Sequence, residues 1–321
     1  MDILFWIAIL AVSLFGLIKS ADYFTEYSEK IGLVFGMSSF IIGATIVAIG
    51  TSLPELVSSL FALNAGEVSF VVDNIVGSNI ANALLILGIG GIVAKTLVAE
   101  TSLIDVELPF FFMSMAGFGY FAMDQVISKT EGLSLIILLV IFIIYQVNQK
   151  PDAADKEEMA DIQSKYTGHD KKKDIIKYGG IVLVSIVTLA ASAKYLIDSI
   201  LTLSELLKIS SSMLTITVVA FGTSLPEILT SVAAIKRGNH GMAIGNVLGS
   251  NTFNLLLIAG LPAMITPLSI APQTFIIGLP FLVIATFIAI FVLFDNKIRP
   301  WEGVAMLFFY GVFIAKIVGI M

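Results

Sequence analysis

Apolar residues follow one another along nearly the whole chain, in runs separated by short polar breaks. Many runs approach or exceed the roughly 20 residues that a helix needs to cross a hydrocarbon core of about 30 Å. The first run follows Asp2 and no basic residue, so we interpret it as a spanning helix rather than a secretory signal. The pattern predicts ten helices, at residues 3–18, 33–64, 70–94, 107–123, 131–148, 176–198, 208–235, 241–266, 273–294 and 300–319.

Composition supports a membrane protein. The 321 residues are 57% hydrophobic and 13% charged, and the mean hydropathy is +0.98; a soluble domain rarely shows such values. The absence of cysteine excludes disulfides, thiolate metal sites and thiol catalysis. The net charge of −6 comes without a basic cluster among aromatics, so nucleic acid is not an expected partner. We expect an all-α integral membrane protein that is not an enzyme.

One long hydrophilic stretch divides the chain into two similar parts. Residues 149–175 are rich in acids and lysines and predict a mobile, solvated linker without chemistry of its own. The first part, residues 1–148, and the second, residues 176–321, then hold five predicted helices each.

The two parts repeat one another. The segment Gly43–Ala62 matches Thr215–Ala234 at an offset of 172, and the segment that begins at Asp73 matches the one at Gly245 with the same offset. Because each part has an odd number of helices, the two enter the membrane from opposite sides. Inverted repeats with interrupted helices near the midplane are a recurrent architecture of secondary transporters.

The distribution of Lys and Arg predicts the orientation. With the N-terminus outside, only Lys129, Lys194, Lys208 and Lys316 of the 18 basic residues fall on the outer side. The positive-inside rule therefore favours both termini outside and a cytoplasmic linker.

Two repeat-related glutamates lie inside apolar segments. Glu55 and Glu227 would each cost about 2.5 to 3.5 kcal/mol at the centre of a membrane helix unless something compensates the charge. No basic residue lies between Lys30 and Lys95, and none between Lys208 and Lys236. The acids therefore indicate bound cations or protons.

Proline precedes each of these glutamates. Pro54 and Pro226 lack a backbone donor and disturb the preceding turn, so each helix is expected to open there. The freed carbonyl groups need partners in lipid, and a cation can supply one. Carboxylates, carbonyls and hydroxyls together are the ligand set of calcium or sodium. The candidate carbonyl and hydroxyl ligands are Gly50, Thr51, Ser52, Gly222, Thr223 and Ser224.

A second repeated motif adds neutral oxygens. Ser78 and Asn82 share one helical face, and Ser250 and Asn254 mirror them. A single motif of this kind usually packs helices, but its duplication together with both glutamates favours function. Asp73 stands where the second repeat has Gly245, and we interpret it as an N-cap or entrance residue rather than a ligand.

The motif GTSLPE followed by GSN-x-x-N, present twice, resembles the calcium/cation antiporter superfamily and, within it, the prokaryotic sodium/calcium exchangers. The resemblance covers nearly the whole chain and implies ten helices with a cytoplasmic linker. It implies that Glu55 and Glu227 bind both Ca²⁺ and Na⁺, and that Thr51 and Thr223 offer carbonyls to Ca²⁺. The residues that it implies for the sodium and central positions are Ala48, Ser52, Ser78, Asn82, Ala220, Ser224, Ser250 and Asn254.

One departure refines the expected function. Some relatives carry Asp at the position of Asn254, whereas this chain has Asn in both repeats. The resemblance therefore implies electrogenic Na⁺/Ca²⁺ exchange without K⁺, by a protein that works as a monomer in a prokaryotic cell membrane. A cation/proton antiporter of the same fold is the nearest alternative, because membrane glutamates can carry protons, and a cation channel is a more remote one.

Overall fold

The computed structural model describes residues 3–34, 48–98, 107–148, 171–208, 210–236, 238 and 240–321. The helical elements of the first part are α1 (Ile3–Val34), α3 (Ala48–Thr51), α4 (Leu53–Asn64), α5 (Val68–Ile80), η2 (Ala81–Ile86), α6 (Leu87–Val93), α7 (Glu107–Phe121), η3 (Ala122–Asp124) and α8 (Lys129–Asn148). Those of the second part are α10 (Lys171–Leu207), α11 (Ser211–Leu214), η4 (Thr215–Val219), α12 (Ala220–Thr223), α13 (Leu225–Lys236), α14 (His240–Phe253), η5 (Asn254–Ile258), α15 (Ala259–Ile265), η6 (Thr274–Gly278), α16 (Leu279–Leu293) and α17 (Pro300–Val318).

The helices confirm the predicted all-α class. Within the described residues, eight segments are long and apolar enough to span a membrane, and each coincides with one of the ten predicted helices. Of the other two, the helix predicted at 33–64 passes through residues 35–47, which lie outside the described part. The helix predicted at 107–123 corresponds to α7, whose described length is 15 residues.

Two of the predicted helices are too short. The first helix was expected to stop at residue 18, but α1 continues to Val34, and α10 runs from Lys171 to Leu207 instead of 176–198. Hydropathy marks the span of the membrane, whereas the helix continues into polar residues with good helical propensity. Ion pairs along the extension of α1 join Lys19 to Asp22 at 3.0 Å and Lys30 to Glu26 at 2.5 Å. The hydrogen bond to Glu26 raises the pKa of Lys30.

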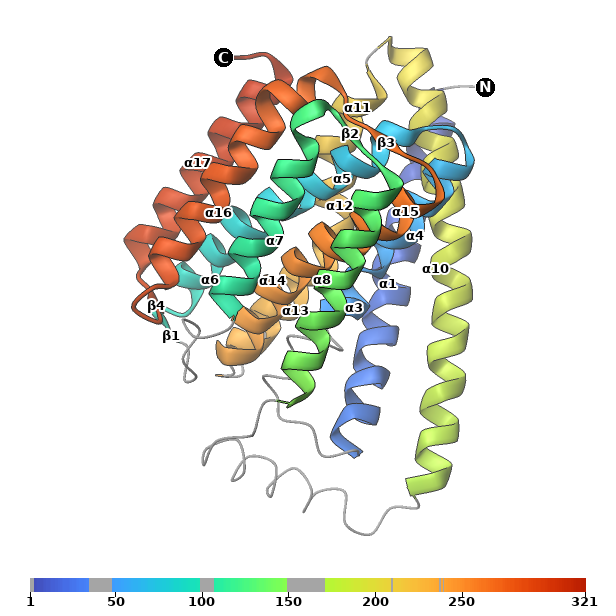
Figure 1. Ribbon diagram of the computed structural model, residues 1–321. Helices are drawn as coiled ribbons and strands as arrows, with labels where there is room; N and C mark the ends of the chain where they lie inside the picture. Colours follow the sequence, from blue (N-terminus) through green and yellow to red (C-terminus); the bar gives the residue numbers. More distant parts are fainter. Residues whose placement is uncertain are drawn as a thin grey trace.

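The long helices α1 and α10 lie side by side at one edge of the molecule (Figure 1). Gly16 allows the close approach, because a Cβ atom there would lie 2.5 Å from Ser192 Oγ. A small apolar cluster separate from the main core joins the pair to α4, and it includes Leu17, Ala62 and Leu196. The α1–α10 pair is thus packed on the bundle through an interface of its own.

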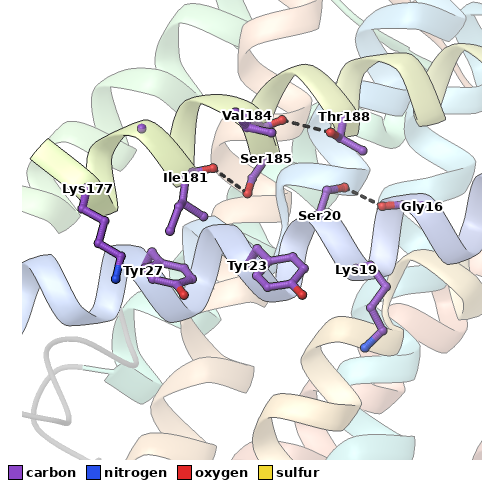
Figure 2. Close-up of a pocket in the computed structure, with 11 residues that line it drawn as sticks. Gly16, Lys19, Ser20, Tyr23, Tyr27, Lys177, Ile181, Val184, Ser185 and Thr188 are labelled. Carbon is purple, nitrogen blue, oxygen red and sulfur yellow. Dashed lines mark hydrogen bonds between the residues drawn. The ribbon is translucent and has the colours of Figure 1, made fainter.

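A cavity of about 590 Å³ lies between α1 and α10. Figure 2 shows Tyr23 and Tyr27 of α1 and Lys177 of α10 along it. Its lining includes no acidic residue, so this cavity is distinct from the predicted cation site.

Two short antiparallel pairs connect the first part of the chain to the second. β1 (Leu97–Val98) pairs with β4 (Lys297–Ile298), and β2 (Val126–Ile127) pairs with β3 (Leu268–Ser269). The pairs lie at different ends of the molecule (Figure 1). At the offset of 171 that relates the later helices, β1 corresponds to β3 and β2 to β4. β1 therefore pairs with the repeat counterpart of β2, and β2 pairs with the repeat counterpart of β1.

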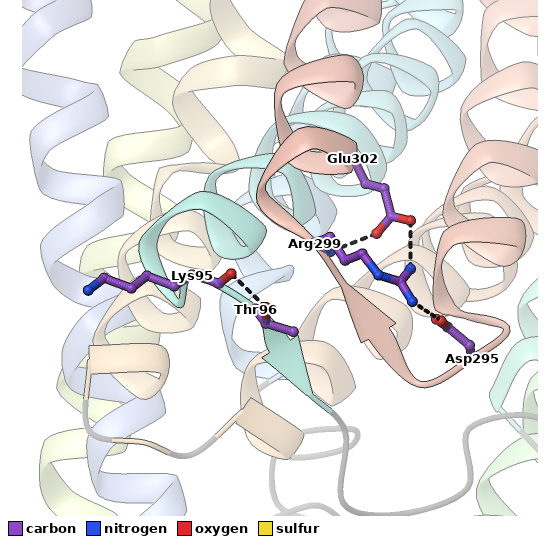
Figure 3. Close-up of polar contacts among 5 residues, drawn as sticks. All are labelled: Lys95, Thr96, Asp295, Arg299 and Glu302. Carbon is purple, nitrogen blue, oxygen red and sulfur yellow. Dashed lines mark hydrogen bonds and ion pairs between the residues drawn. The ribbon is translucent and has the colours of Figure 1, made fainter.

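Arg299 organises the turn between α16 and α17 (Figure 3). Its guanidinium donates to Asp295 Oδ2 at 2.7 Å and to Glu302 Oε1 at 3.1 Å, and its backbone N–H donates to Glu302 Oε2 at 2.6 Å. The Arg299 bond holds the pKa of Asp295 below its ordinary value. The contribution of this ion pair is therefore present at neutral pH and is lost as the pH falls through the lowered pKa.

We expect Arg299→Ala to lower the melting temperature only slightly, because the ion pairs are exposed to solvent and the backbone bond from residue 299 to Glu302 survives. Thermal unfolding in detergent measures the effect. Lys297→Ala, which removes an exposed charge from the same turn, serves as the control. An equal shift in both variants would contradict a specific role of Arg299.

Candidate functional site

Both helices that carry the glutamates are interrupted, as the prolines predict. The chain breaks at Ser52 between α3 and α4, and at Ser224 between α12 and α13. The bonds from Ser52 N to Ala48 O and from Leu56 N to Ser52 O survive at 3.1 Å. Pro54 has no N–H to donate to Gly50 O. Carbonyl groups at the break are thereby available to a ligand.

The twelve residues that the family resemblance implies for the site are all buried, with at most 3% of each exposed. A polar side chain without contact to solvent needs partners within the protein or a bound ligand.

The structure brings the two parts of the chain together at the breaks. Ser52 Oγ donates to Glu227 Oε1 at 3.3 Å, so a serine of the first break contacts the glutamate of the second. Thr51 Oγ1 lies 3.3 Å from Ser250 Oγ. Ser78 Oγ donates to Glu55 Oε1 at 3.5 Å, a long and weak contact. The two acids thus lie in one polar region at the centre of the fold.

Several buried oxygens in this region have no hydrogen-bond partner in the protein. Each glutamate has one unpaired carboxylate oxygen, and both Asn82 and Asn254 have an unpaired amide. Ser224 Oγ is also unpaired. Each unpaired buried polar group costs about 1 to 3 kcal/mol, so such a group of them favours a bound ligand. Carboxylate, amide and hydroxyl oxygens suit a hard cation.

A polar network beside the site was missed by the sequence reasoning. Asn246 Nδ2 donates to Ser231 Oγ at 3.0 Å, and its Oδ1 accepts from Thr51 at 3.3 Å. The repeat mates Asn74 and Ser59 are buried, but neither makes a hydrogen bond through its side chain. The repeat offset of 172 could have identified both pairs, because Ser59 matches Ser231 and Asn74 matches Asn246.

This difference between Asn246 and its repeat mate Asn74 predicts that their substitution by alanine changes the stability of the protein unequally. We expect Asn246→Ala to lower the free energy of unfolding by about 1 to 3 kcal/mol, since it removes the partner of the buried Ser231 Oγ and one of the contacts of Thr51 Oγ1. Asn74→Ala removes a buried amide that pairs with nothing and is expected to be near neutral. Thermal unfolding of the two variants under the same ionic conditions measures the difference. Equal destabilisation would contradict the asymmetry of the network.

Small residues hold the surrounding helices close. A Cβ atom at Gly77 of α5 would lie 2.5 Å from Ala220 Cβ and 2.7 Å from Ile216 O. A Cβ atom at Gly222 of α12 would lie 2.6 Å from Leu14 of α1. The interrupted helix α12 is therefore enclosed between α5 and the peripheral helix α1.

The fold and the site together define a helical integral membrane protein in which carboxylate, amide and hydroxyl oxygens are buried at the breaks of two helices. The model of the family described as sodium/calcium exchanger protein matches residues 5–148 and 177–318. The chain belongs to the sodium/calcium exchanger family, whose members are antiporters, and it is a cation exchanger of that family.

Curated relatives and solved structures agree with this assignment. The chain is 30% identical to the sodium/calcium exchanger MaX1 of Methanosarcina acetivorans, over 95% of this chain and 96% of the relative. It is 28% identical to the inner membrane protein YrbG of Escherichia coli, over 94% and 92% of the two chains. A structure of the sodium-calcium exchanger NCX_Mj is 26% identical, with a TM-score of 0.69 over 98% of this chain and 99% of that one.

Proposed function

We propose that this protein exchanges Na⁺ for Ca²⁺ across the cell membrane, and that Glu55 and Glu227 bind both ions in turn. The observation that carries the proposal is the group of buried, unpaired oxygens on Glu55, Glu227, Asn82 and Asn254. Two carboxylates balance one Ca²⁺, and the neutral amides and hydroxyls complete its shell. Similarity to the sodium/calcium exchanger MaX1 supports the choice of ions.

The further predicted ligands belong to the same proposal. The carbonyls of Thr51 and Thr223 would bind Ca²⁺ at the two helix breaks. The additional groups that would serve Na⁺ or the central position are those of Ala48, Ser52, Ser78, Ala220, Ser224 and Ser250. The absence of a third acid at Asn254 leaves two charges at the centre. Binding of more than two Na⁺ ions would then make exchange electrogenic, and K⁺ would have no role.

The mechanism that we propose is alternating access by two inverted five-helix halves, residues 1–148 and 176–321, joined by the linker at 149–175. Matching backbone features support such halves, since Gly66 and Gly238 both have positive φ, as do Gln125 and Asn296. The α1–α10 pair, with its separate packing cluster, would slide across the bundle. We place both termini outside and the linker in the cytoplasm.

Flux measurements test this function directly. Proteoliposomes loaded with Na⁺ should take up Ca²⁺ when diluted into Na⁺-free medium, and the rate should rise when the membrane potential draws positive charge outward. Replacing choline by K⁺ in the external medium, from which Ca²⁺ enters, should leave the rate unchanged. Uptake that is independent of Na⁺ would contradict the proposal.

Proton coupling is the second candidate, because the same buried glutamates could carry protons. A pH gradient without Na⁺ separates the two. Ca²⁺ uptake driven by that gradient alone would favour the Ca²⁺/H⁺ antiporter. Currents far above exchanger turnover would instead support a channel.

A further inference from the structure

Asp73 is a buried acid outside the predicted site. It lies on α5, five residues before Ser78, which corresponds to about 7.5 Å along a helix. Its exposed fraction is 0%, and its repeat mate is Gly245, so the second repeat has no counterpart. In the described part of the chain, no basic side chain forms an ion pair with it. The expectation of an N-cap role is wrong, because α5 begins at Val68 and the residue before it is Glu67.

Hydroxyl groups from two other elements surround this carboxylate. Thr274, at the start of η6, donates a hydrogen bond to Asp73 Oδ1. Ser212 of α11 faces the same carboxylate. Yet Asp73 Oδ2 and Ser212 Oγ are both buried and lack a hydrogen-bond partner in the protein. A charged group and a hydroxyl that face each other unpaired are the arrangement that a small cation would complete.

We propose that Asp73, Thr274 and Ser212 form an accessory site for a single Na⁺ ion. The one negative charge balances a monovalent cation, whereas a divalent ion would remain half compensated. The site lies in the first half of α5, and the start of this helix is towards the end of the molecule where the chain ends are marked (Figure 1). It therefore flanks the Glu55 and Glu227 region on that side.

The accessory site would supply a charge that the central site lacks. The two glutamates balance the charge of only two monovalent ions, and the two asparagines are neutral. The carboxylate of Asp73 would balance the charge of a third Na⁺ ion. In this respect the inference rests on the proposed Na⁺ coupling. Binding at Asp73 itself is measurable without transport.

Equilibrium binding of radioactive Na⁺ to the purified full-length protein tests the site. We expect Asp73→Asn and Asp73→Gly to remove one bound Na⁺ per chain, and Thr274→Val to weaken that ion at least roughly tenfold, because charged ligands and their hydroxyl partners contribute strongly. Thr286→Val removes another buried, unpaired hydroxyl, on α16, and serves as the control with unchanged binding.

A second background separates this site from the central one. In Glu55→Gln/Glu227→Gln protein, Na⁺ at constant ionic strength should still raise the melting temperature, and Asp73→Asn should abolish that shift. The same Na⁺ count with and without Asp73 in the otherwise unchanged chain would overturn the inference, whether or not the double variant folds. A shift that follows pH and not Na⁺ would also overturn it, in favour of a proton. If the unchanged protein binds no Na⁺ at all, the proposed function fails as well.

Discussion

Replacement of either membrane glutamate by glutamine is expected to reduce Ca²⁺ uptake into Na⁺-loaded proteoliposomes at least roughly 100-fold. Glu55 and Glu227 are fully buried, and each has an unpaired carboxylate oxygen. Loss of one partner from a buried charge interaction costs about 3 kcal/mol or more, and each 1.4 kcal/mol corresponds to about a factor of ten in affinity.

Substitution by glutamine isolates the effect of the carboxylate charge. Glutamine preserves size and one oxygen ligand, so lost uptake reports the lost charge. As the control, Glu67→Gln should leave uptake unchanged, because Glu67 is partly exposed and directly precedes α5. Melting temperatures of all three variants show whether the fold is intact. Uptake that persists in Glu55→Gln protein would exclude Glu55 as an essential ligand.

Gly77→Ala is expected to destabilise the protein by about 1 to 3 kcal/mol and to abolish most transport. The added Cβ atom would lie 2.5 Å from Ala220 Cβ and 2.7 Å from the carbonyl oxygen of Ile216. Because the oxygen belongs to the backbone of η4, α5 must move away from η4 and from α12, which follows it directly, and overpacking of this kind costs about 1 to 3 kcal/mol. The movement would displace α12, which carries Thr223.

Gly119→Ala on α7 is the matched control, since nothing lies within 4 Å of the atom it adds. There the substitution should be neutral or stabilise the helix by up to about 1 kcal/mol. Thermal unfolding and Ca²⁺ uptake measure both variants. A Gly77→Ala protein with the melting temperature and uptake of the unchanged chain would contradict the close contact between α5 and α12.

The helix interruptions were predictable because their cause is local. Proline removes a donor wherever it stands, so Pro54 and Pro226 predict the breaks observed at Ser52 and Ser224. The ends of α1 and α10 were not predictable from hydropathy, because a helix can continue into water through residues of high propensity. The two-residue strands are too short to produce a periodic pattern.

The chemical types of the site residues and their grouping were predictable. Acids, amides and hydroxyls that recur in apolar helices cost free energy, so their repetition indicates a function. Their burial is confirmed, whereas their role as ligands stays a prediction. The network of Asn246 was not predicted, because its bond to Ser231 joins two packed helices and its contact with Thr51 joins residues 195 positions apart in the chain.

By itself, the sequence determined the membrane class, the interrupted helices and the two glutamates in apolar segments that contain no basic residue. These properties depend on residue chemistry and on spacing along one helix. Only the tertiary structure decided that Ser52 contacts Glu227 of the other part and that Thr274 contacts Asp73. Such contacts arise where helices distant in the chain pack together, and local periodicity contains no information about that pairing.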